Sequence, residues 1–245
     1  MTIWRLLRAD WLKTRRTPLR WAIFLVPAGY ALLLLWYFSS FPASPELAAK
    51  IYYAFFEVWT SFLPLLFGVL AGLMCLQEEQ AGGFAAMLGL PVSRSGIYAS
   101  KLVMLIAAAL GSLLLAAAIL VIGAKFVLGI GALDAGSFGK GALLATAGAL
   151  ALCALHLWLS LAFGFGAGVG IGGAGLLISA IIGATGVGDA IWEAVPWAWP
   201  VRLAMHPMAA VALPRVLLYA LLLFVFIAVC SLLWFQRWEG RKQEE

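Results

Sequence analysis

Charged residues are scarce in this chain of 245 residues. Asp, Glu, Lys and Arg make up 11% of the sequence, whereas 64% of the residues are hydrophobic. A soluble domain has roughly a quarter charged residues, so the deficit excludes an ordinary soluble globular protein. The sequence predicts an all-α integral membrane protein.

Residues able to carry chemistry are also few. Cys75, Cys153 and Cys230 each lie inside an apolar run without metal-ligand or redox spacing, so they are expected to act as small hydrophobic residues. The sequence has no H-E-x-x-H or G-x-S-x-G motif and no paired carboxylates within its apolar segments. We therefore expect neither enzymatic activity nor a metal or cofactor on this chain.

Glycines in one apolar run formally match a dinucleotide motif. Gly168, Gly170 and Gly173 fit G-x-G-x-x-G, but this motif needs a preceding strand within a βαβ unit. Gly164, Gly168 and Gly172, spaced by four residues, instead favour close packing between membrane helices.

A P-loop is missing as well. The nearest stretch, GSFGKG, fails because Asp134 stands where the pattern begins and Gly141 follows the lysine. Any ATP hydrolysis linked to this chain must therefore take place on another chain.

Six apolar segments are long enough to cross a bilayer, which needs roughly 20 helical residues. They run approximately over Leu19–Phe41, Ile51–Leu76, Leu102–Leu128, Gly141–Phe163, Gly166–Val187 and Val216–Phe235. The fourth and fifth segments nearly merge. We expect residues 19–235 to form a transmembrane domain of six helices, followed by a tail over residues 236–245.

Basic residues are distributed unevenly between the two sides of this arrangement. With the N-terminus inside, eleven of the 16 Lys and Arg residues lie on the inner side, and five lie outside: Lys50, Lys125, Lys140, Arg202 and Arg215. Positive residues accumulate in cytoplasmic loops, so both termini are predicted to be cytoplasmic. The net charge of +5 is thus explained by membrane orientation, and nucleic acid is not an expected partner.

Residues 1–18 are predicted to form an interfacial helix. Trp4, Leu7 and Trp11 share one helical face, whereas Lys13 and Arg16 lie elsewhere around the helix. Tryptophan at headgroup depth beside basic residues is typical of a helix that contacts membrane lipids. The alternative is a basic flank that only orients the first span.

Residues 188–214 are too interrupted by proline for one spanning helix and too apolar for a solvated loop. Short helices dipping into the outer leaflet fit both properties. Trp192, Trp197 and Trp199 are interpreted as an interfacial aromatic belt, with contact to a cargo as the alternative.

Two ionisable residues lie within predicted spans. His156, near the middle of the fourth span, is predicted to be hydrogen-bonded within the packing; a proton relay or cargo contact is the alternative. Glu57, near the outer end of the second span, is predicted to be hydrated, with a cargo-facing role as the alternative.

The polar stretch Glu78–Lys101 separates the second and third spans and is predicted to face the cytoplasm. Glu78 and Glu79 are expected to begin a short helix, because acidic residues complement the positive end of a helix dipole. Phe84, Met87 and Leu88 recur at helical spacing and predict an exposed apolar patch, which would invite a soluble partner.

The end of this stretch contains a stop and a start signal. Pro91 is expected to end the short helix, and Ser93 or Ser95 to cap the next one. The alternative is a hairpin that merely connects two spans, but about 25 residues exceed what a connector needs.

The pattern Glu79…Gly83…Leu88…Pro91…Arg94…Tyr98…Lys101 resembles the loop between spans two and three of type-2 ATP-binding cassette (ABC) exporter permeases. In that family, a coupling helix in this loop docks onto the ATPase subunit. The stretches RADWLKTRRTPLRW and VPWAWPVRL resemble one branch, the lantibiotic-immunity permeases.

The resemblance implies a coupling loop over residues 77–101 and a connecting helix at the N-terminus. Its ATPase-contacting or supporting residues would be Glu78, Glu79, Gly83, Phe84, Met87, Leu88, Pro91 and Arg94. ATP and Mg²⁺ would be bound by a separate cytoplasmic ATPase, and a second, identical or related permease would complete the transporter.

The same resemblance implies a bacterial plasma membrane protein that expels an antimicrobial peptide for self-immunity. Three alternatives stay open: a type-2 permease for a drug, lipid or polysaccharide, a membrane scaffold or sensor that does not transport, and an intramembrane enzyme.

Overall fold

The computed structural model describes residues 3–15, 17–89, 91–131, 133–205 and 212–241. These residues form helices joined by turns, without a strand among them. Six helical segments are long and apolar enough to cross a membrane, which confirms the predicted all-α architecture. They are α2 (Pro18–Phe38), α3 (Pro45–Gln80), α5 (Arg94–Phe126), α6 (Ala135–Phe163), α7 (Phe165–Ile178) with its π-helical continuation η1 (Ser179–Gly183), and α9 (Ala212–Arg237).

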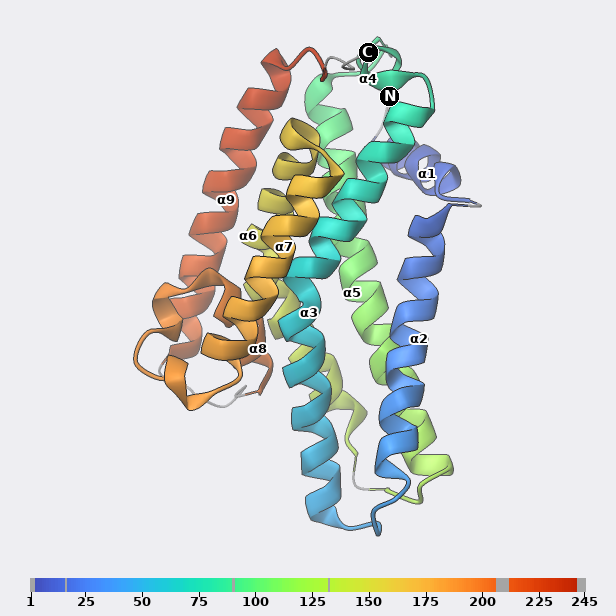
Figure 1. Cartoon of the computed structure of the whole chain (residues 1–245), viewed down its shortest axis with the longest axis vertical. Helices are drawn as coiled ribbons and strands as arrows, with labels where there is room; N and C mark the ends of the chain where they lie inside the picture. Colours follow the sequence, from blue (N-terminus) through green and yellow to red (C-terminus); the bar gives the residue numbers. More distant parts are fainter. Residues whose placement is uncertain (1–2, 16, 90, 132, 206–211, 242–245) are drawn as a thin grey trace.

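The described ends of the chain lie at the same end of the bundle, because six crossings return the chain to its starting side (Figure 1). The short helix α4 (Gly83–Leu88) lies there, and α1 (Ile3–Lys13) crosses the bundle axis beside α5. We call this the α4 end. The far end is where α2 turns into α3.

Capping side chains fix where the long helices begin. Ser44 precedes α3, Ser93 precedes α5 and Asp134 precedes α6, and each accepts a hydrogen bond from a backbone N–H of the first turn. Ser93 was one of the two predicted caps. The hydrogen bonds that Ser137 donates to Asp134 hold the pKa of this carboxyl below its usual value.

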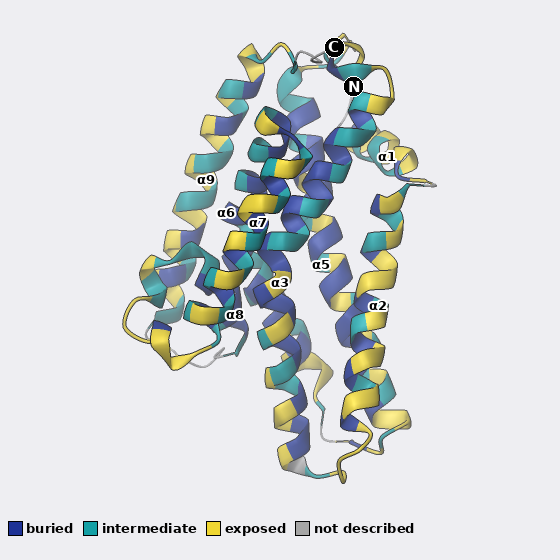
Figure 2. Cartoon of the chain, in the orientation of Figure 1, coloured by how far each residue is buried: buried dark blue, intermediate teal, exposed yellow. Residues whose placement is uncertain are grey.

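Helix α3 is the central element of the bundle. Its 36 residues, at about 1.5 Å per residue, span about 54 Å, well beyond a hydrocarbon core of about 30 Å. It packs against α7, α6, α8 and α2. Figure 2 shows the buried residues concentrated on α3 and α5, whereas the outer faces of α2 and α9 are exposed and apolar, as lipid-facing surfaces are.

Glycine allows α3 and α7 to pack backbone against backbone. A Cβ atom at Gly68 of α3 would overlap the carbonyl oxygen of Gly168, and one at Gly172 would lie 2.8 Å from the carbonyl oxygen of Pro64. This contact confirms the packing predicted for Gly168 and Gly172. Gly164 has another role: with φ +94° it forms the turn that separates α6 from α7.

Short helices follow α7, as predicted for residues 188–214 as far as these are described. They are η2 (Gly186–Gly188), η3 (Trp192–Ala194), η4 (Pro196–Ala198) and α8 (Trp199–Met205); residues 206–211 lie outside the described ranges. Arg202 holds this region to the end of η1, donating to the carbonyl oxygens of Ile182 and Thr185 and pairing with Asp189.

Candidate functional site

The candidate site is the α4 end, where five elements meet: α1, the end of α3, α4, the start of α5, and the segment after α9. Glycine creates the sharp turn that places α4 there. Gly82 and Gly83 have φ of +114° and +77°, a backbone conformation that L side chains rarely adopt. The chain therefore leaves α3 abruptly, and α4 packs across its end.

The two acidic residues before this turn belong to α3. Glu78 and Glu79 were predicted to begin the short helix, but they lie in the last turn of α3, which ends at Gln80. An acid there faces the negative end of the helix dipole, which is unfavourable by itself. Each carboxylate instead has a basic partner from another element.

Glu78 is buried in a three-element ion cluster. Its carboxylate accepts hydrogen bonds from Lys101 at 2.7 Å and from Lys13 at 3.0 and 3.1 Å. These residues join α3 to α5 and α1, and Ser100 adds a 2.6 Å hydrogen bond to Asp10. Only 5% of Glu78 is exposed, so this residue connects helices within the chain.

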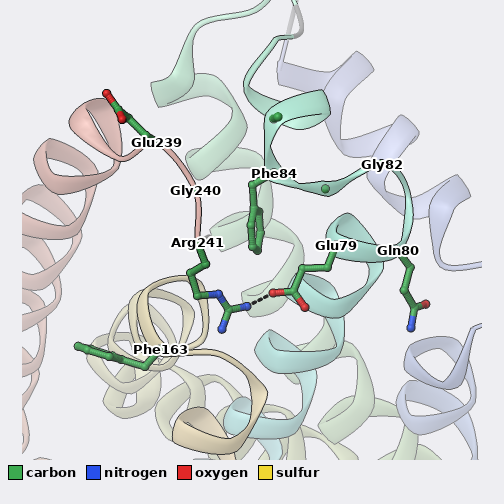
Figure 3. Close-up of a pocket in the computed structure, with 10 residues that line it drawn as sticks. Glu79, Gln80, Gly82, Phe84, Phe163, Glu239, Gly240 and Arg241 are labelled. Atoms are coloured by element: carbon green, nitrogen blue, oxygen red, sulfur yellow. Dashed lines mark hydrogen bonds and ion pairs between the residues drawn. The ribbon is translucent and has the colours of Figure 1, made fainter. Parts of the chain in front are cut away.

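Glu79 pairs with Arg241, which comes from the segment after α9. The Arg241 guanidinium also lies 5.4 Å from the ring centroid of Phe84, and the Trp238 ring lies 4.8 Å from the same ring. Glu79, Arg241 and Phe84 border a pocket of about 1040 Å³ (Figure 3). The pocket is lined by Glu79, Gln80, Gly82, Gly83, Phe84, Ala85, Phe163, Glu239, Gly240 and Arg241.

The prediction of an exposed apolar patch on the short helix was wrong. Phe84 and Met87 are only 5% and 3% exposed, and Leu88 is half-buried against the core. Phe84 is covered by Trp238 and Arg241, whereas Met87 points into the bundle core. The exposed surface here is made of small residues instead: Ala81, Gly82, Ala85, Ala86, Gly89 and Pro91.

Arg94, at the first position of α5, reaches the end of α9 and the segment that follows it. Its guanidinium donates to the carbonyl oxygens of Gln236 at 2.9 Å and Trp238 at 2.8 Å. A cation at the C-terminus of a helix satisfies free carbonyl groups and complements the dipole. Arg94 therefore fixes the end of α9 within the chain.

Helix α1 occupies residues predicted to form the interfacial helix. Leu7 and Trp11 pack against the bundle, whereas Trp4 is 71% exposed. Lys13 reaches Glu78. Arg16, also assigned to this segment, lies outside the described residues.

The residues considered for cargo contact are not gathered in one place. Trp192 packs in the same cluster as Trp199, whose Nε1 donates to the carbonyl oxygen of Glu193. Trp197 belongs to the main core instead, and Glu57 is half-buried on α3.

His156 is fully buried on α6, with its ring centroid 6.4 Å from that of Phe67. It was predicted to be hydrogen-bonded, and its ring interacts with the backbone of Gly168 on α7. Within the described part of the chain, neither ring nitrogen makes a hydrogen bond of standard length and angle, and neither does Ser160 Oγ one turn later. In the same described residues, no group of three His, Cys, Asp or Glu side chains could hold a metal ion.

Sequence reasoning missed the residues of the C-terminal segment. Trp238 and Arg241 contact Phe84 and Glu79, yet they follow the last span and were interpreted only as part of a tail. Lys101 was part of the recognised pattern, but its pairing with Glu78 was not foreseen. The signal in the sequence that could have indicated these contacts is the presence of a tryptophan and an arginine directly after the last span.

Comparison with known proteins assigns the chain to a family. The family model described as "ABC-2 family transporter protein" matches residues 6–172, from α1 to the middle of α7, with the whole of α4 inside the match. Neither the curated proteins nor the solved structures contain a match to this sequence. Because the family match covers well over half of its length, the chain belongs to the ABC-2 family of transporter proteins.

Proposed function

We propose that this ABC-2 permease is the membrane-spanning subunit of an exporter whose ATPase docks at the α4 end. The family supports an ATP-hydrolysing partner subunit and, usually, pairing of two permeases. The second permease is identical or related to this chain, and ATP and Mg²⁺ are held by the ATPase. The α4 end faces the cytoplasm of a bacterial cell, in agreement with the eleven basic residues predicted on that side.

The observation that carries this proposal is the position of α4. It lies across the end of a continuous membrane-spanning helix, and its outward surface consists of small side chains such as Ala85 and Ala86. Such a surface allows close approach of another protein, while Met87 anchors the opposite face in the bundle core. The glycines on either side leave the helix accessible.

The ion cluster beside α4 supports a coupling role. Glu78 ties the end of α3 to α5 and α1 through Lys101 and Lys13, so a force applied at this end reaches three helices. Coupling requires that the two conformations of the transporter differ in their contacts with the ATPase. ATP-driven approach of two ATPase subunits supplies that difference.

An amphipathic antimicrobial peptide is the proposed cargo, removed from the membrane to protect its producer. The support is the likeness of the N-terminal stretch and of VPWAWPVRL to lantibiotic-immunity permeases. Export of a drug, lipid or polysaccharide is the second candidate, since it uses the same bundle and ATPase.

Substitution at the surface of α4 tests the docking. Ala86→Glu places a charge on the exposed side of α4 and is expected to reduce co-purification with the partner ATPase at least tenfold. Ala43→Glu, at an exposed position of the far end, is the matched control and should co-purify normally. Wild-type yield of ATPase with Ala86→Glu would contradict docking at α4.

A transport assay then separates the candidates. Vesicles containing the permease and its ATPase should hydrolyse ATP faster when a lantibiotic is added, and should release the peptide from the membrane. ATP turnover that responds to a lipid or drug but not to the peptide would select the other cargo. Turnover indifferent to every cargo would favour a scaffold or sensor.

A further inference from the structure

Glycine stands directly at both ends of α4, where the connections to the neighbouring spans begin. Gly82 and Gly83 link it to α3 with positive φ, and Gly89 follows its last residue. A backbone of glycines adopts many conformations at little cost, so it transmits force poorly. The position of α4 must therefore depend on the side chains that hold it.

The segment Trp238–Arg241, which directly follows α9 and which we call the C-terminal clasp, supplies such a hold. The Trp238 ring lies 4.8 Å from the Phe84 ring. Arg241 covers the same ring while pairing with Glu79 (Figure 3). Gly240, with φ +95°, passes close to Phe84: a Cβ there would lie 3.0 Å from the Phe84 Cβ. The clasp thus contacts the buried face of α4 and the last turn of α3.

The clasp is also firmly attached to α9. The Trp238 ring lies 5.4 Å from Trp234 and 5.5 Å from Phe235, both within α9. Arg94 fixes it from the other side, through its hydrogen bonds to the carbonyl oxygens of Gln236 and Trp238. The clasp is therefore an extension of α9 that is tied to the start of α5.

We propose that the C-terminal clasp transmits the displacement of α4 to α9, with Trp238 and Arg241 as positioning residues for transport. This inference rests on the proposed docking of an ATPase at α4. When the ATPase moves α4, the Phe84 ring pushes on Trp238, and the last span follows through its aromatic end. The Glu79–Arg241 pair keeps the clasp in place beside α4 and the end of α3.

The exposure of the ion pair suits this role. The side chains of Arg241 and Glu79 are 24% and 26% exposed, so water can replace part of their interaction. Such a pair is weaker than one that is fully buried, and can open and close within a transport cycle. The side chains of Glu78 and Lys101 are only 6% and 3% exposed, so water cannot replace their interaction. We therefore expect the Glu78 cluster to stay closed while the Glu79–Arg241 pair opens.

Hydrogen exchange of the permease alone, in lipid nanodiscs, tests the mechanical link. Arg241→Glu places two negative charges together, and should raise amide exchange at least fivefold both in residues 83–89 and in residues 234–241. Arg237→Glu, an exposed position on the last turn of α9, makes the same charge change and should leave α4 unchanged.

The charge-swapped double variant decides between a specific contact and general damage. Glu79→Arg combined with Arg241→Glu restores opposite charges and should return both segments to within twofold of wild-type exchange. Unchanged exchange of α4 in Arg241→Glu, or no recovery in the swap, would overturn the inference. Trp238→Phe keeps an aromatic ring, and should raise exchange less than Trp238→Ala.

Measurements on the complete transporter distinguish transmission of movement from a purely structural role of the clasp. In Arg241→Glu, the amount of bound ATPase should stay within twofold of wild type, whereas cargo-stimulated ATP turnover should fall at least fivefold. The charge-swapped double variant should recover this turnover. Loss of ATPase binding in proportion to turnover would overturn the inference and make the clasp a docking surface. If the wild type binds no ATPase, the proposed function fails, and the exchange results still decide whether the clasp connects α4 to α9.

Discussion

The α4 end and the middle of the bundle are held together in different ways. At the α4 end, carboxylates and basic side chains from distant elements meet, as Glu78 does with Lys13 and Lys101. In the middle, α3 and α7 approach through glycine, and a side chain at Gly68 would collide with the Gly168 backbone. One region depends on specific partners and the other on the absence of side chains.

The difference follows from the surroundings of each region. Lipid tails are as apolar as leucine, so burial of apolar side chains does not drive helices together within a bilayer, and close van der Waals packing does. Near the membrane surface, a charge can be buried when it keeps an oppositely charged partner. Substitutions in the two regions should therefore fail for different reasons.

Breaking the Glu78 cluster should have the largest effect. Lys101→Met leaves a buried carboxylate with only the half-exposed Lys13 as a partner, and should lower the free energy of unfolding by about 3–5 kcal/mol. Lys125→Met, the same substitution at the exposed far end of α5, should change it little. The free energy is measured by denaturant titration in detergent, and equal losses in both variants would contradict the cluster's importance.

Adding one methyl group to the α3–α7 contact should have the next largest effect. Gly68→Ala forces the two backbones apart and should cost about 1–3 kcal/mol, as overpacking does elsewhere. Gly170→Ala is the matched control on the outward side of α7, where a Cβ meets nothing within 4 Å. It should gain up to about 1 kcal/mol from its higher helix propensity. The same unfolding titration should give the two variants opposite signs.

Removing the buried imidazole of His156 should stabilise the middle of the bundle. A buried polar group without a hydrogen bond of good geometry costs about 1–3 kcal/mol, so His156→Leu should raise the free energy of unfolding by about 1–2 kcal/mol. Tyr98→Phe is the contrasting variant, because the Tyr98 hydroxyl hydrogen-bonds Ser231 at 2.6 Å and its loss should destabilise. Destabilisation by His156→Leu would mean that the imidazole has a partner in the membrane.

Capping at the α4 end should give the smallest effect. Ser93→Ala removes the side chain that accepts from the Gly96 N–H, and should cost about 1 kcal/mol of stability. Ser95→Ala should cost less, because Ser95 accepts only an exposed side-chain hydrogen bond from Gln236 and does not cap the helix. Equal effects in thermal unfolding would remove the distinction between the two serines.

The features set by local sequence were predictable. Segments of some twenty apolar residues identify spans irrespective of how these pack, so all six were found. Ser93 was recognised as a cap from its place before a helix, and Gly168 and Gly172 from their four-residue spacing. None of these predictions needed a contact between distant parts of the chain.

The details of the candidate site depend on such distant contacts. Phe84 was predicted to be exposed because Trp238, which covers it, lies more than 150 residues later in the sequence. Glu78 and Glu79 were assigned to a helix start by the dipole rule, although the Gly82–Gly83 pair marked the end of α3. Their basic partners, Lys13, Lys101 and Arg241, come from three separate elements, which sequence periodicity cannot bring together.

The glycine turn between α6 and α7 has a consequence for biogenesis. From Gly141 to Val201 the sequence has neither lysine nor arginine, and the single residue Gly164 replaces a polar loop. These two spans thus carry no orientation signal of their own, and must enter the bilayer together, as a hairpin oriented by the segments around it. Among the described residues, Arg241 brings a positive charge to this turn, and it is synthesised after both spans.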